Sequence, residues 1–533
     1  MTTHSSPAHS PGQVLPFRES LKAVIGLAFL VMLVALDQTV VSTALPTIAA
    51  ELKGFELYAW VATAYLLSSV ITVPIFGRLG DYYGRKPFVV GSIIVFISAS
   101  ALCATAGSML FLVIARGIQG IGAGMLLGTA MACIPDLFPD SRVRLRWQVI
   151  TSSAFGIANA IGPSLGGFMT EAYGWRSLFF INLPVGLVSL WFVWRHLPHL
   201  RRPQSSATIQ IDWFGALLIG LGLGTLQLSV ESLSRNGFSF GTTALLGTSA
   251  VSLGALWAWE GRCRHPILPL EMFRSPRLAP LFLLALLSGF VMFSLLIYAP
   301  LLFQGGFGMS PREAGVIVTP LVVCITIASI INGRIVTRLR SPRRMLYLGF
   351  ILMTAVCLCM AFSTHLTSHG LLLILMMMGG LGLGFVNPNL MIFSQVTAGR
   401  EVLGIATAMQ QSLRMVGGML GTALIGTVVS YRYASAMGSA LRHAQAQRWA
   451  AAFADPKILV DKAAQTALLL HLRQAGDDGA MLLGQAREAL VGSIHLGLAM
   501  AAIVGALATW RVCRVPYVQL VPENKAVSLP EQS

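Results

Sequence analysis

Long apolar runs separated by short charged stretches are the main pattern of the chain. Between Lys22 and Glu51, for example, lie 28 residues of which Asp37 alone carries a formal charge. An α-helix needs about 20 apolar residues to cross the hydrocarbon core of a bilayer. Because the apolar residues are continuous rather than alternating with polar ones, the pattern favours membrane-spanning helices over barrel strands. We therefore expect an all-α membrane protein.

Fourteen runs are long enough to span a membrane. The predicted spans are 20–44, 58–78, 87–106, 109–133, 147–170, 177–197, 213–231, 238–259, 278–303, 314–337, 345–363, 370–394, 403–430 and 490–511. The segment 431–489 is predicted to be a long extracytoplasmic loop. Its residues 464–473 alternate between apolar and charged stretches in a way that predicts a short amphipathic helix, to which we assign no role.

Composition agrees with this pattern. Only 11% of the 533 residues are charged, whereas soluble domains contain about 25%, so a water-soluble multidomain chain is excluded. The seven cysteines include no C-x-x-C pair and indicate neither a disulfide framework nor a zinc site. The first 17 residues are polar and lack the apolar core of a signal peptide. We therefore expect the first span to remain in the mature protein.

Basic residues are distributed unevenly between the predicted loops. With the N-terminus in the cytoplasm, 24 of the 37 Lys and Arg residues fall on the cytoplasmic side, as the positive-inside rule requires. This predicts a multi-pass protein of the cell inner membrane with both termini cytoplasmic. The net charge of +16 then reflects loops that face anionic membrane lipid, and not a nucleic-acid partner.

A short repeat suggests two related halves. GRLGDYYGRK occupies 77–86, and GRIVTR begins 256 residues after its start, at Gly333. Related halves are common in transporters. The predicted domains are a cytoplasmic tail (1–19), an N-terminal six-helix bundle (20–200), two extra helices (201–265), a C-terminal six-helix bundle (266–515) and a second cytoplasmic tail (516–533).

No motif indicates an enzyme. Residues 162–166 read GPSLG and fit the G-x-S-x-G nucleophile elbow, but that motif needs a strand before it, and here it lies within a predicted span. The chain has no G-x-x-x-x-G-K-[ST] phosphate-binding loop. His196 and His199 are three residues apart but lie among arginines, which is typical of a solvated basic loop rather than of a metal site.

Several motifs in a fixed order resemble those of the major facilitator superfamily, and within it the fourteen-span drug:proton antiporters. They are LDQTVVSTALP at 36–46, GRLGDYYGRK at 77–86, RGIQG at 116–120, GIANAIGPSLGG at 156–167, WRSLFFINLP at 175–184 and SPREAG at 310–315. The resemblance covers nearly all spans. It implies two six-helix bundles with two extra central helices, and a proton gradient in place of any cofactor. In a Gram-negative cell, a periplasmic adaptor and an outer-membrane channel are further partners to consider.

The sequence departs from the family pattern at three points. Ser42 stands where the first-helix motif commonly has Asn, and Thr337 stands where the first loop copy has Asp81. Spans nine to thirteen contain no acidic residue apart from Glu313 at an edge, and they contain a basic one, Arg414, inside. This argues against a preference for multiply charged cations.

Asp37 and Arg116 are the candidate proton-coupling residues. A charge inside a membrane helix is costly and usually functional, although a structural residue satisfied by its neighbours is the alternative for Asp37. Arg116 precedes Gly120, Gly124 and Gly128 at four-residue spacing, which places it on a small-residue stripe that faces other helices. We expect Asp37 and Arg116 to form one network, directly or through water. Proton coupling at this site is implied by the resemblance.

Two more motifs have roles that the resemblance implies. In the cytoplasmic-loop motif, Asp81 would bind Arg142 or Arg144 and hold the outward-facing state. The alternative is that the charges of this loop serve only to set the membrane topology. The other residues of that motif are Gly77, Gly84, Arg85 and Lys86. The antiporter motif would form a seam between the halves that closes the outward side, with plain tight packing as the alternative. Its residues are Gly156, Gly162, Pro163, Gly166 and Gly167.

Polar and aromatic residues within the spans are candidates for a substrate cavity. They are Gln38, Tyr65, Gln119, Asn159, Asn387, Gln410, Gln411 and Arg414. Buried amides usually satisfy the backbone or each other, so any single one of them suits a structural role as well.

Together these observations predict a proton-coupled multidrug efflux transporter that binds amphipathic drugs and protons. Two alternatives stay open. One is a narrow-specificity exporter or importer of a fatty acid, natural product or other small solute. The other is a membrane receptor or scaffold that does not transport.

Overall fold

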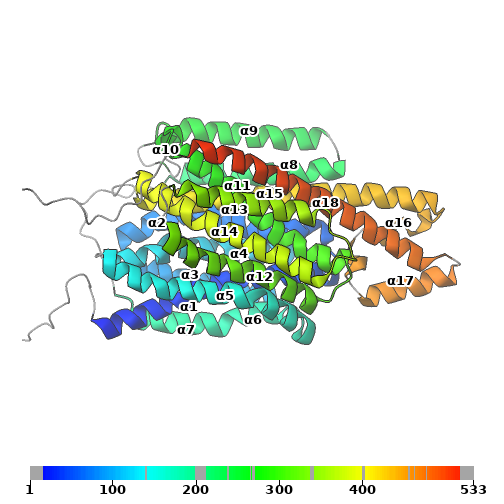
Figure 1. The fold of residues 1–533 in the computed structure, drawn as a ribbon, viewed down its shortest axis with the longest axis horizontal. Coiled ribbons are helices and arrows are strands. Elements are labelled where there is room, and N and C mark those ends of the chain that lie inside the picture. The colour runs from blue at the N-terminus through cyan, green and yellow to red at the C-terminus, as the bar shows by residue number, and fades with distance from the viewer. Residues whose placement is uncertain are drawn as a thin grey trace, which may run out of the picture.

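The computed structural model describes most of the chain and shows only helices in it. The described residues are 16–138, 141–198, 212–236, 239–263, 266, 270–336, 341–398, 403–453, 456–460, 462–475 and 477–515. Within them the long helices lie side by side along one axis (Figure 1). This arrangement confirms the predicted all-α membrane fold.

Helices of the first part of the chain follow the predicted spans closely. They are α1 (Phe17–Glu51), η1 (Phe55–Leu57), α2 (Tyr58–Tyr83), α3 (Arg85–Ala104), α4 (Met109–Leu137), α5 (Ser141–Tyr173), α6 (Ser177–Phe180), α7 (Asn182–His196), α8 (Trp213–Asn236) and α9 (Phe240–Glu260).

The second part continues in the same way and adds short helices near its end. Its elements are α10 (Leu270–Arg274), α11 (Ala279–Leu301), η2 (Leu302–Gly306), α12 (Pro311–Ile335), α13 (Arg343–Met360), α14 (His369–Ala398), α15 (Leu403–His443), η4 (Gln447–Trp449), α16 (Ala450–Phe453), η5 (Pro456–Leu459), α17 (Lys462–Gln474), α18 (Gly479–Arg511) and η6 (Val512–Arg514).

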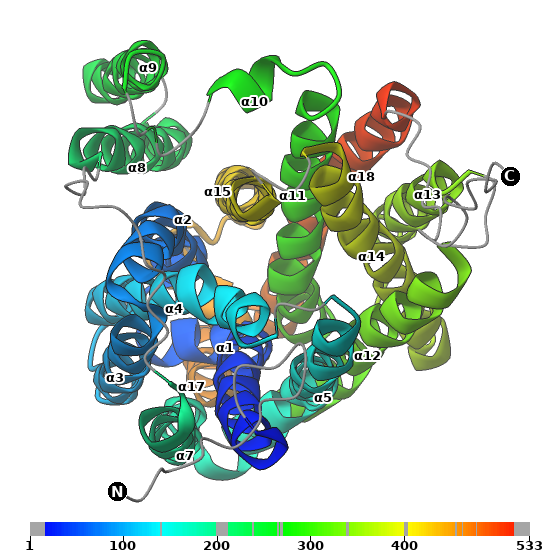
Figure 2. The same ribbon diagram turned by 90° about the vertical axis from the view of Figure 1, so that its left-hand side faces the viewer.

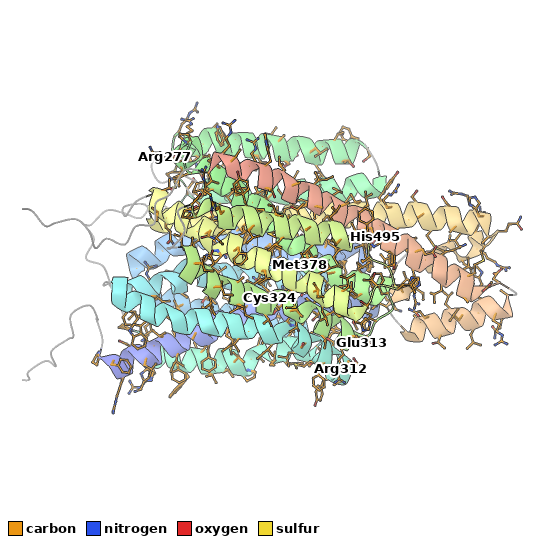
Figure 3. All side chains as sticks on the ribbon, viewed as in Figure 1. Arg277, Arg312, Glu313, Cys324, Met378 and His495 are labelled. Atoms are coloured by element: carbon orange, nitrogen blue, oxygen red, sulfur yellow. The ribbon has the colours of Figure 1, made fainter. Side chains whose placement is uncertain are left out.

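Twelve segments of the described chain are long and apolar enough to cross a membrane. Helices α5 and α8, which occupy the fifth and seventh predicted spans, complete the fourteen. Among the labelled side chains, Arg277 lies at one end of the helices and Arg312 and Glu313 lie at the other, with Cys324 between them (Figure 3). Such a distribution suits a bilayer whose apolar core surrounds the middle of the molecule.

The long helices form two groups with a helix pair beside them. Helices α1–α7 pack on one another, and so do α11–α18. Seen along the helices, α15 lies between α2 and α11, and the pair α8–α9 lies at the periphery (Figure 2), where α8 packs on α15 and α2. The two groups meet where α5 packs on α12, α2 packs on α15, and α1 packs on α11.

The predicted loop at 431–489 is shorter in the structure. Helix α15 continues to His443 and α18 already begins at Gly479, because a helix can continue into water beyond the bilayer where Ala-rich sequence favours it. Helix α17 confirms the short helix predicted over 464–473.

The segments between α15 and α18 lie at the end of the molecule opposite the N-terminus (Figure 1). We call this end the loop end, and the opposite end the termini end.

Candidate functional site

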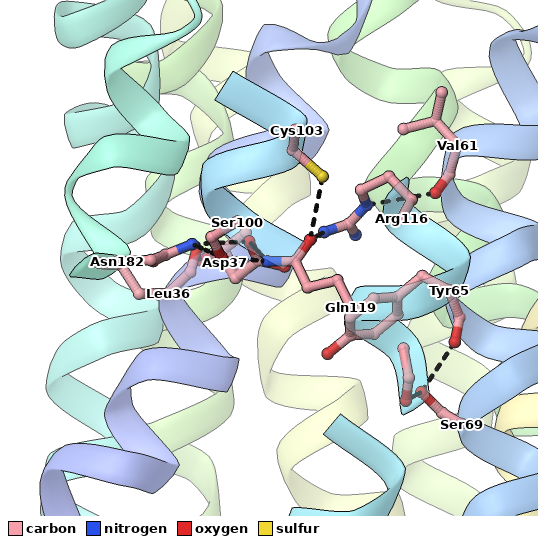
Figure 4. Close-up of polar contacts among 12 residues, drawn as sticks. Leu36, Asp37, Val61, Tyr65, Ser69, Ser100, Cys103, Arg116, Gln119 and Asn182 are labelled. Atoms are coloured by element: carbon pink, nitrogen blue, oxygen red, sulfur yellow. Dashed lines mark hydrogen bonds and ion pairs between the residues drawn. The ribbon is translucent and has the colours of Figure 1, made fainter. Parts of the chain in front are cut away.

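A buried ion pair lies inside the first group of helices. Arg116 Nη1 of α4 donates to Asp37 Oδ2 of α1 over 2.6 Å, and both residues are at most 3% exposed. The predicted contact between Asp37 and Arg116 is therefore confirmed, and it is direct (Figure 4). In a low-dielectric interior such a pair is stable only when hydrogen bonds satisfy its remaining polar atoms.

Neutral side chains from α3, α4 and α7 complete the environment of Asp37. Gln119 Nε2 donates to Asp37 Oδ1 over 2.9 Å, and Asn182 Nδ2 donates to the same oxygen over 3.0 Å. Both amides also donate to Ser100 Oγ, over 2.8 Å and 3.2 Å respectively. The carboxylate thus accepts from one guanidinium and two amides, which suits its ionised form because that form has only acceptors.

The Arg116 guanidinium is fixed on several sides. Nη1 also donates to Gln119 Oε1 over 2.6 Å, and Nε donates to the Val61 carbonyl over 3.4 Å. The guanidinium lies over the Tyr65 ring, 4.4 Å from its centroid, where the negative face of an aromatic ring attracts a cation. These contacts keep the charge away from lipid and next to Asp37.

The glycine stripe of α4 explains how Arg116 reaches this position. A Cβ added to Gly120, Gly124 or Gly128 would lie 2.3–2.7 Å from a backbone carbonyl oxygen of α2. Those carbonyls belong in order to Tyr65, Ser69 and Val73. Arg116 continues the same register, because its partner Val61 lies four residues before Tyr65. The small residues let the two helices approach closely, which brings the arginine against α2 and the Asp37 cluster.

A pocket adjoins this ion pair and is shared by both helix groups. Gln38, Tyr65 and Arg116 form its wall on the first group, and Phe293, Leu296 and Ile297 of α11 form its wall on the second. The rest of its lining is aliphatic or small: Val41, Ser42, Leu45, Val61, Ala62 and Leu66. Arg116 thus touches both the Asp37 cluster and a mostly apolar pocket between the two helix groups.

The structure distributes the other cavity candidates differently. Gln119 is buried in the Asp37 cluster and not in the pocket wall. Gln410 Oε1 accepts from Ser394 on α14 over 3.1 Å. Asn387, Gln411 and Arg414 are partly buried. The Asn159 side chain lies outside the described residues.

Three members of the cluster were not singled out by the sequence. Asn182 stands at the first position of α7, Ser100 lies in α3, and Cys103 Sγ lies 3.7 Å from Gln119 Oε1. Neutral residues of these types are frequent in the spans and have no distinguishing spacing. Asn182 had one usable signal, since it lies in the WRSLFFINLP motif.

The antiporter motif forms close contacts on two sides of α5. A Cβ on Gly162 or Gly166 would collide with Thr39 or Thr43 of α1, whereas one on Gly156 or Gly167 would collide with α12. On the α12 side, a Cβ on Gly315 would come within 2.4 Å of the Pro163 carbonyl. The α5–α12 contact is therefore a seam between the two helix groups.

The loop motif is described only in part. Gly84 has a φ of 92°, a conformation that favours glycine, and it turns the chain from α2 into α3. Gly77 packs against Gly128 of α4, Arg85 is buried and Lys86 is partly exposed. The side chains of Asp81, Arg142 and Arg144 lie outside the described residues, so the expected contact of Asp81 stays a prediction.

Sequence comparisons agree with this geometry. Residues 27–422 match the family model of the Major Facilitator Superfamily. The chain is 33% identical over 412 residues to the multidrug transporter protein MdtP of Bacillus subtilis, covering 77% of this chain and 75% of that one. It is 30% identical to the tetracenomycin C resistance and export protein of Streptomyces glaucescens, with 81% and 80% covered.

Among solved structures, a bacterial homologue of the human lysosomal transporter Spinster is similar in its inward-facing and unoccupied conformation. The TM-score is 0.63 at 15% identity, over 94% of this chain and 98% of that chain. At this level of identity the likeness concerns the fold alone.

Proposed function

The chain belongs to the Major Facilitator Superfamily, and on that premise we propose that it exports amphipathic small molecules in exchange for protons by alternating access. The family and its transporter-named relatives make it a membrane transporter, with efflux as its activity, and not an enzyme. Proton coupling, drug substrates, an inner-membrane location and cytoplasmic termini are our proposals. No cofactor enters the proposal, because the proton gradient supplies the energy.

The observation that carries the proposal is the buried Asp37–Arg116 pair at the wall of the pocket. A proton taken up by Asp37 would remove the charge that Arg116 binds. Arg116 would then be free to turn toward the pocket it already lines. Turned into the pocket, the guanidinium would take the space of a bound molecule, so a molecule in the pocket and a proton on Asp37 would exclude each other, which is the coupling that an antiporter needs.

Hydrogen bonds across the two helix groups support a conformation that is closed at the loop end. Gln304 Nε2 donates to the Thr43 carbonyl over 2.7 Å, and Thr47 Oγ1 donates to Gln304 Oε1 over 3.3 Å. Ser164 and Thr319 share a hydrogen bond across the α5–α12 seam, and Tyr58 Oη donates to the Ile297 carbonyl over 3.0 Å. We propose that this end faces away from the cytoplasm.

A narrow-specificity exporter is the second candidate. The Streptomyces glaucescens relative is named for resistance to and export of a single compound, tetracenomycin C. The mostly apolar pocket is compatible with one specific substrate as well as with many chemically unrelated substrates.

Efflux from cells tests the proposal. In a host that lacks its own efflux pumps, expression should lower the accumulation of ethidium and of chemically unrelated dyes, and an uncoupler should restore it. Export of one compound class alone would favour the narrow-specificity exporter. Export that persists after the proton gradient is collapsed would contradict proton coupling.

A further inference from the structure

Arg414 lies inside the long helix α15, 11 residues from its start. It belongs to a segment that is long and apolar enough to span the membrane. A charge inside such a segment is rare and needs a compensating partner.

In the part of the chain that the structure describes, Arg414 has no such partner. Its Nε is buried without a hydrogen bond, and the residue makes no ion pair. The buried charges of Asp37 and Arg116 neutralise each other, so neither of them compensates Arg414. The Arg414 guanidinium is therefore a positive charge that the surrounding described residues leave uncompensated.

The contacts of neighbouring residues on α15 show the direction in which Arg414 points. Gly417 and Gly421 pack on α11, where an added Cβ would meet the carbonyls of Leu286 and Phe290. Thr422 packs on α2 through a 3.2 Å contact with Thr63. At 100° per residue, position 414 lies between these two faces. Because α15 lies between α2 and α11 (Figure 2), that direction leads to the interior between the helix groups.

The pocket begins one helical turn away from Arg414 along α15. A Cβ on Gly418, four residues after Arg414, would lie 2.3 Å from the Phe293 ring, and Phe293 lines the pocket. One turn earlier on α11, a Cβ on Gly289 would collide with the Arg414 carbonyl. Arg414 is thus next to the pocket, on the side toward the termini end. The other end of the pocket holds Arg116, which is already paired.

We propose that Arg414 binds the acidic group of the transported molecule, so that the preferred substrates are amphipathic carboxylates and related anions. The apolar part would occupy the pocket and the carboxylate would accept from the guanidinium, which is a strong, charge-assisted interaction. The absence of acidic residues inside spans nine to thirteen agrees with an anionic rather than a cationic substrate. This inference rests on the proposed export function and specifies its substrate class.

Binding of a matched pair of probes tests the inference without any proton gradient. The probes are 1-pyrenebutyrate and its uncharged amide, measured by fluorescence with the purified full-length chain in nanodiscs, after subtraction of empty nanodiscs. We expect the wild type to bind the acid at least about tenfold more tightly than the amide, since one charge-assisted hydrogen bond is worth this much. Equal binding of the two probes, or no binding of the acid, would overturn the inference.

Variants then assign the preference to one residue. Arg414→Gln should abolish the difference between acid and amide, and Arg414→Lys should retain most of it. Arg432→Gln removes the same charge from an exposed position of the same helix and should leave the difference unchanged. A preference that survives in Arg414→Gln would contradict the assignment. Because binding needs no gradient, a failure of proton-coupled efflux leaves these results interpretable.

Discussion

At the scale of single residues, the Asp37 cluster combines one charged pair with a shell of neutral donors. Arg116, Gln119 and Asn182 come from α4 and α7 and converge on one carboxylate of α1. The predicted part was the charged pair, because a charge within an apolar run stands out in the sequence. Gln119 was a candidate for the cavity and Asn182 lies in a motif, but their convergence on Asp37 could not be predicted, since it depends on which helices are neighbours.

Removing one neutral donor should weaken the cluster measurably. Asn182→Ala removes one of the two amide hydrogen bonds that Asp37 Oδ1 accepts, and a hydrogen bond to a charged group contributes about 1.5–3 kcal/mol. We therefore expect a lower free energy of unfolding for this variant, measured by thermal unfolding in detergent. Thr248→Ala, on the exposed side of α9, is the control and should behave as the wild type. An unchanged midpoint for Asn182→Ala would show that its hydrogen bond is dispensable.

The geometry of Arg116 should matter as well as its charge. Arg116→Lys keeps the cation but has one compact ammonium in place of a planar guanidinium, so it cannot hold Asp37, Gln119 and the Val61 carbonyl together while stacking on Tyr65. We expect folded protein whose efflux rate is at least about tenfold lower. Efflux and surface expression should be measured together in the same cells. Wild-type efflux in this variant would reduce the role of Arg116 to its charge alone.

At the scale of helices, glycine positions set the distances between elements. The four-residue stripe of α4 was predicted to face other helices, and the structure identifies α2 as the partner. The C-terminal end of α15 and the start of α18 were not predicted correctly. The hydrophobicity of a sequence indicates which residues lie in the membrane, but it does not indicate at which residue a helix begins or ends. Span prediction therefore succeeds where apolar length decides, and fails where a helix continues into water.

Two glycines of α4 allow a matched test of close packing. A Cβ on Gly124 would lie 2.7 Å from the Ser69 carbonyl, whereas one on Gly117 would have no atom within 4 Å. Gly124→Ala should therefore destabilise the protein by about 1–3 kcal/mol through overpacking. Gly117→Ala should be neutral or more stable by up to about 1 kcal/mol, owing to helix propensity. The midpoints of thermal unfolding of the two variants should be compared with that of the wild type, and equal midpoints would refute the packing account.

At the scale of the whole molecule, the segments between α15 and α18 form a cap at the loop end. We define the loop cap as η4, α16, η5 and α17. Its element η5 packs on α1 of the first helix group and on η2 and α18 of the second. A cap that touches both groups at the closed end must rearrange if that end opens. The sequence indicated the helix in this segment but not the contact with α1.

Acid should loosen the loop cap. The Trp449 indole donates a hydrogen bond to Asp477, and Arg448 donates two more; these interactions lower the pKa of Asp477 below its ordinary value. The stabilisation is present at neutral pH and is lost as the pH falls through that lowered pKa. Hydrogen exchange of residues 447–475, corrected for intrinsic rates, should accelerate in this range. Asp477→Asn should remove this pH dependence, and a pH-dependent profile like that of the wild type would contradict the assignment.

The central claim is that Asp37 couples substrate movement to proton movement. The most direct measurement uses purified protein in liposomes with a pH-sensitive dye inside, to which a compound whose export the cell assay has established is added. The wild type should move protons in the direction opposite to the substrate. Asp37→Asn should bind the same compound, remain folded and move no protons. Proton movement at the wild-type rate in Asp37→Asn would contradict the account.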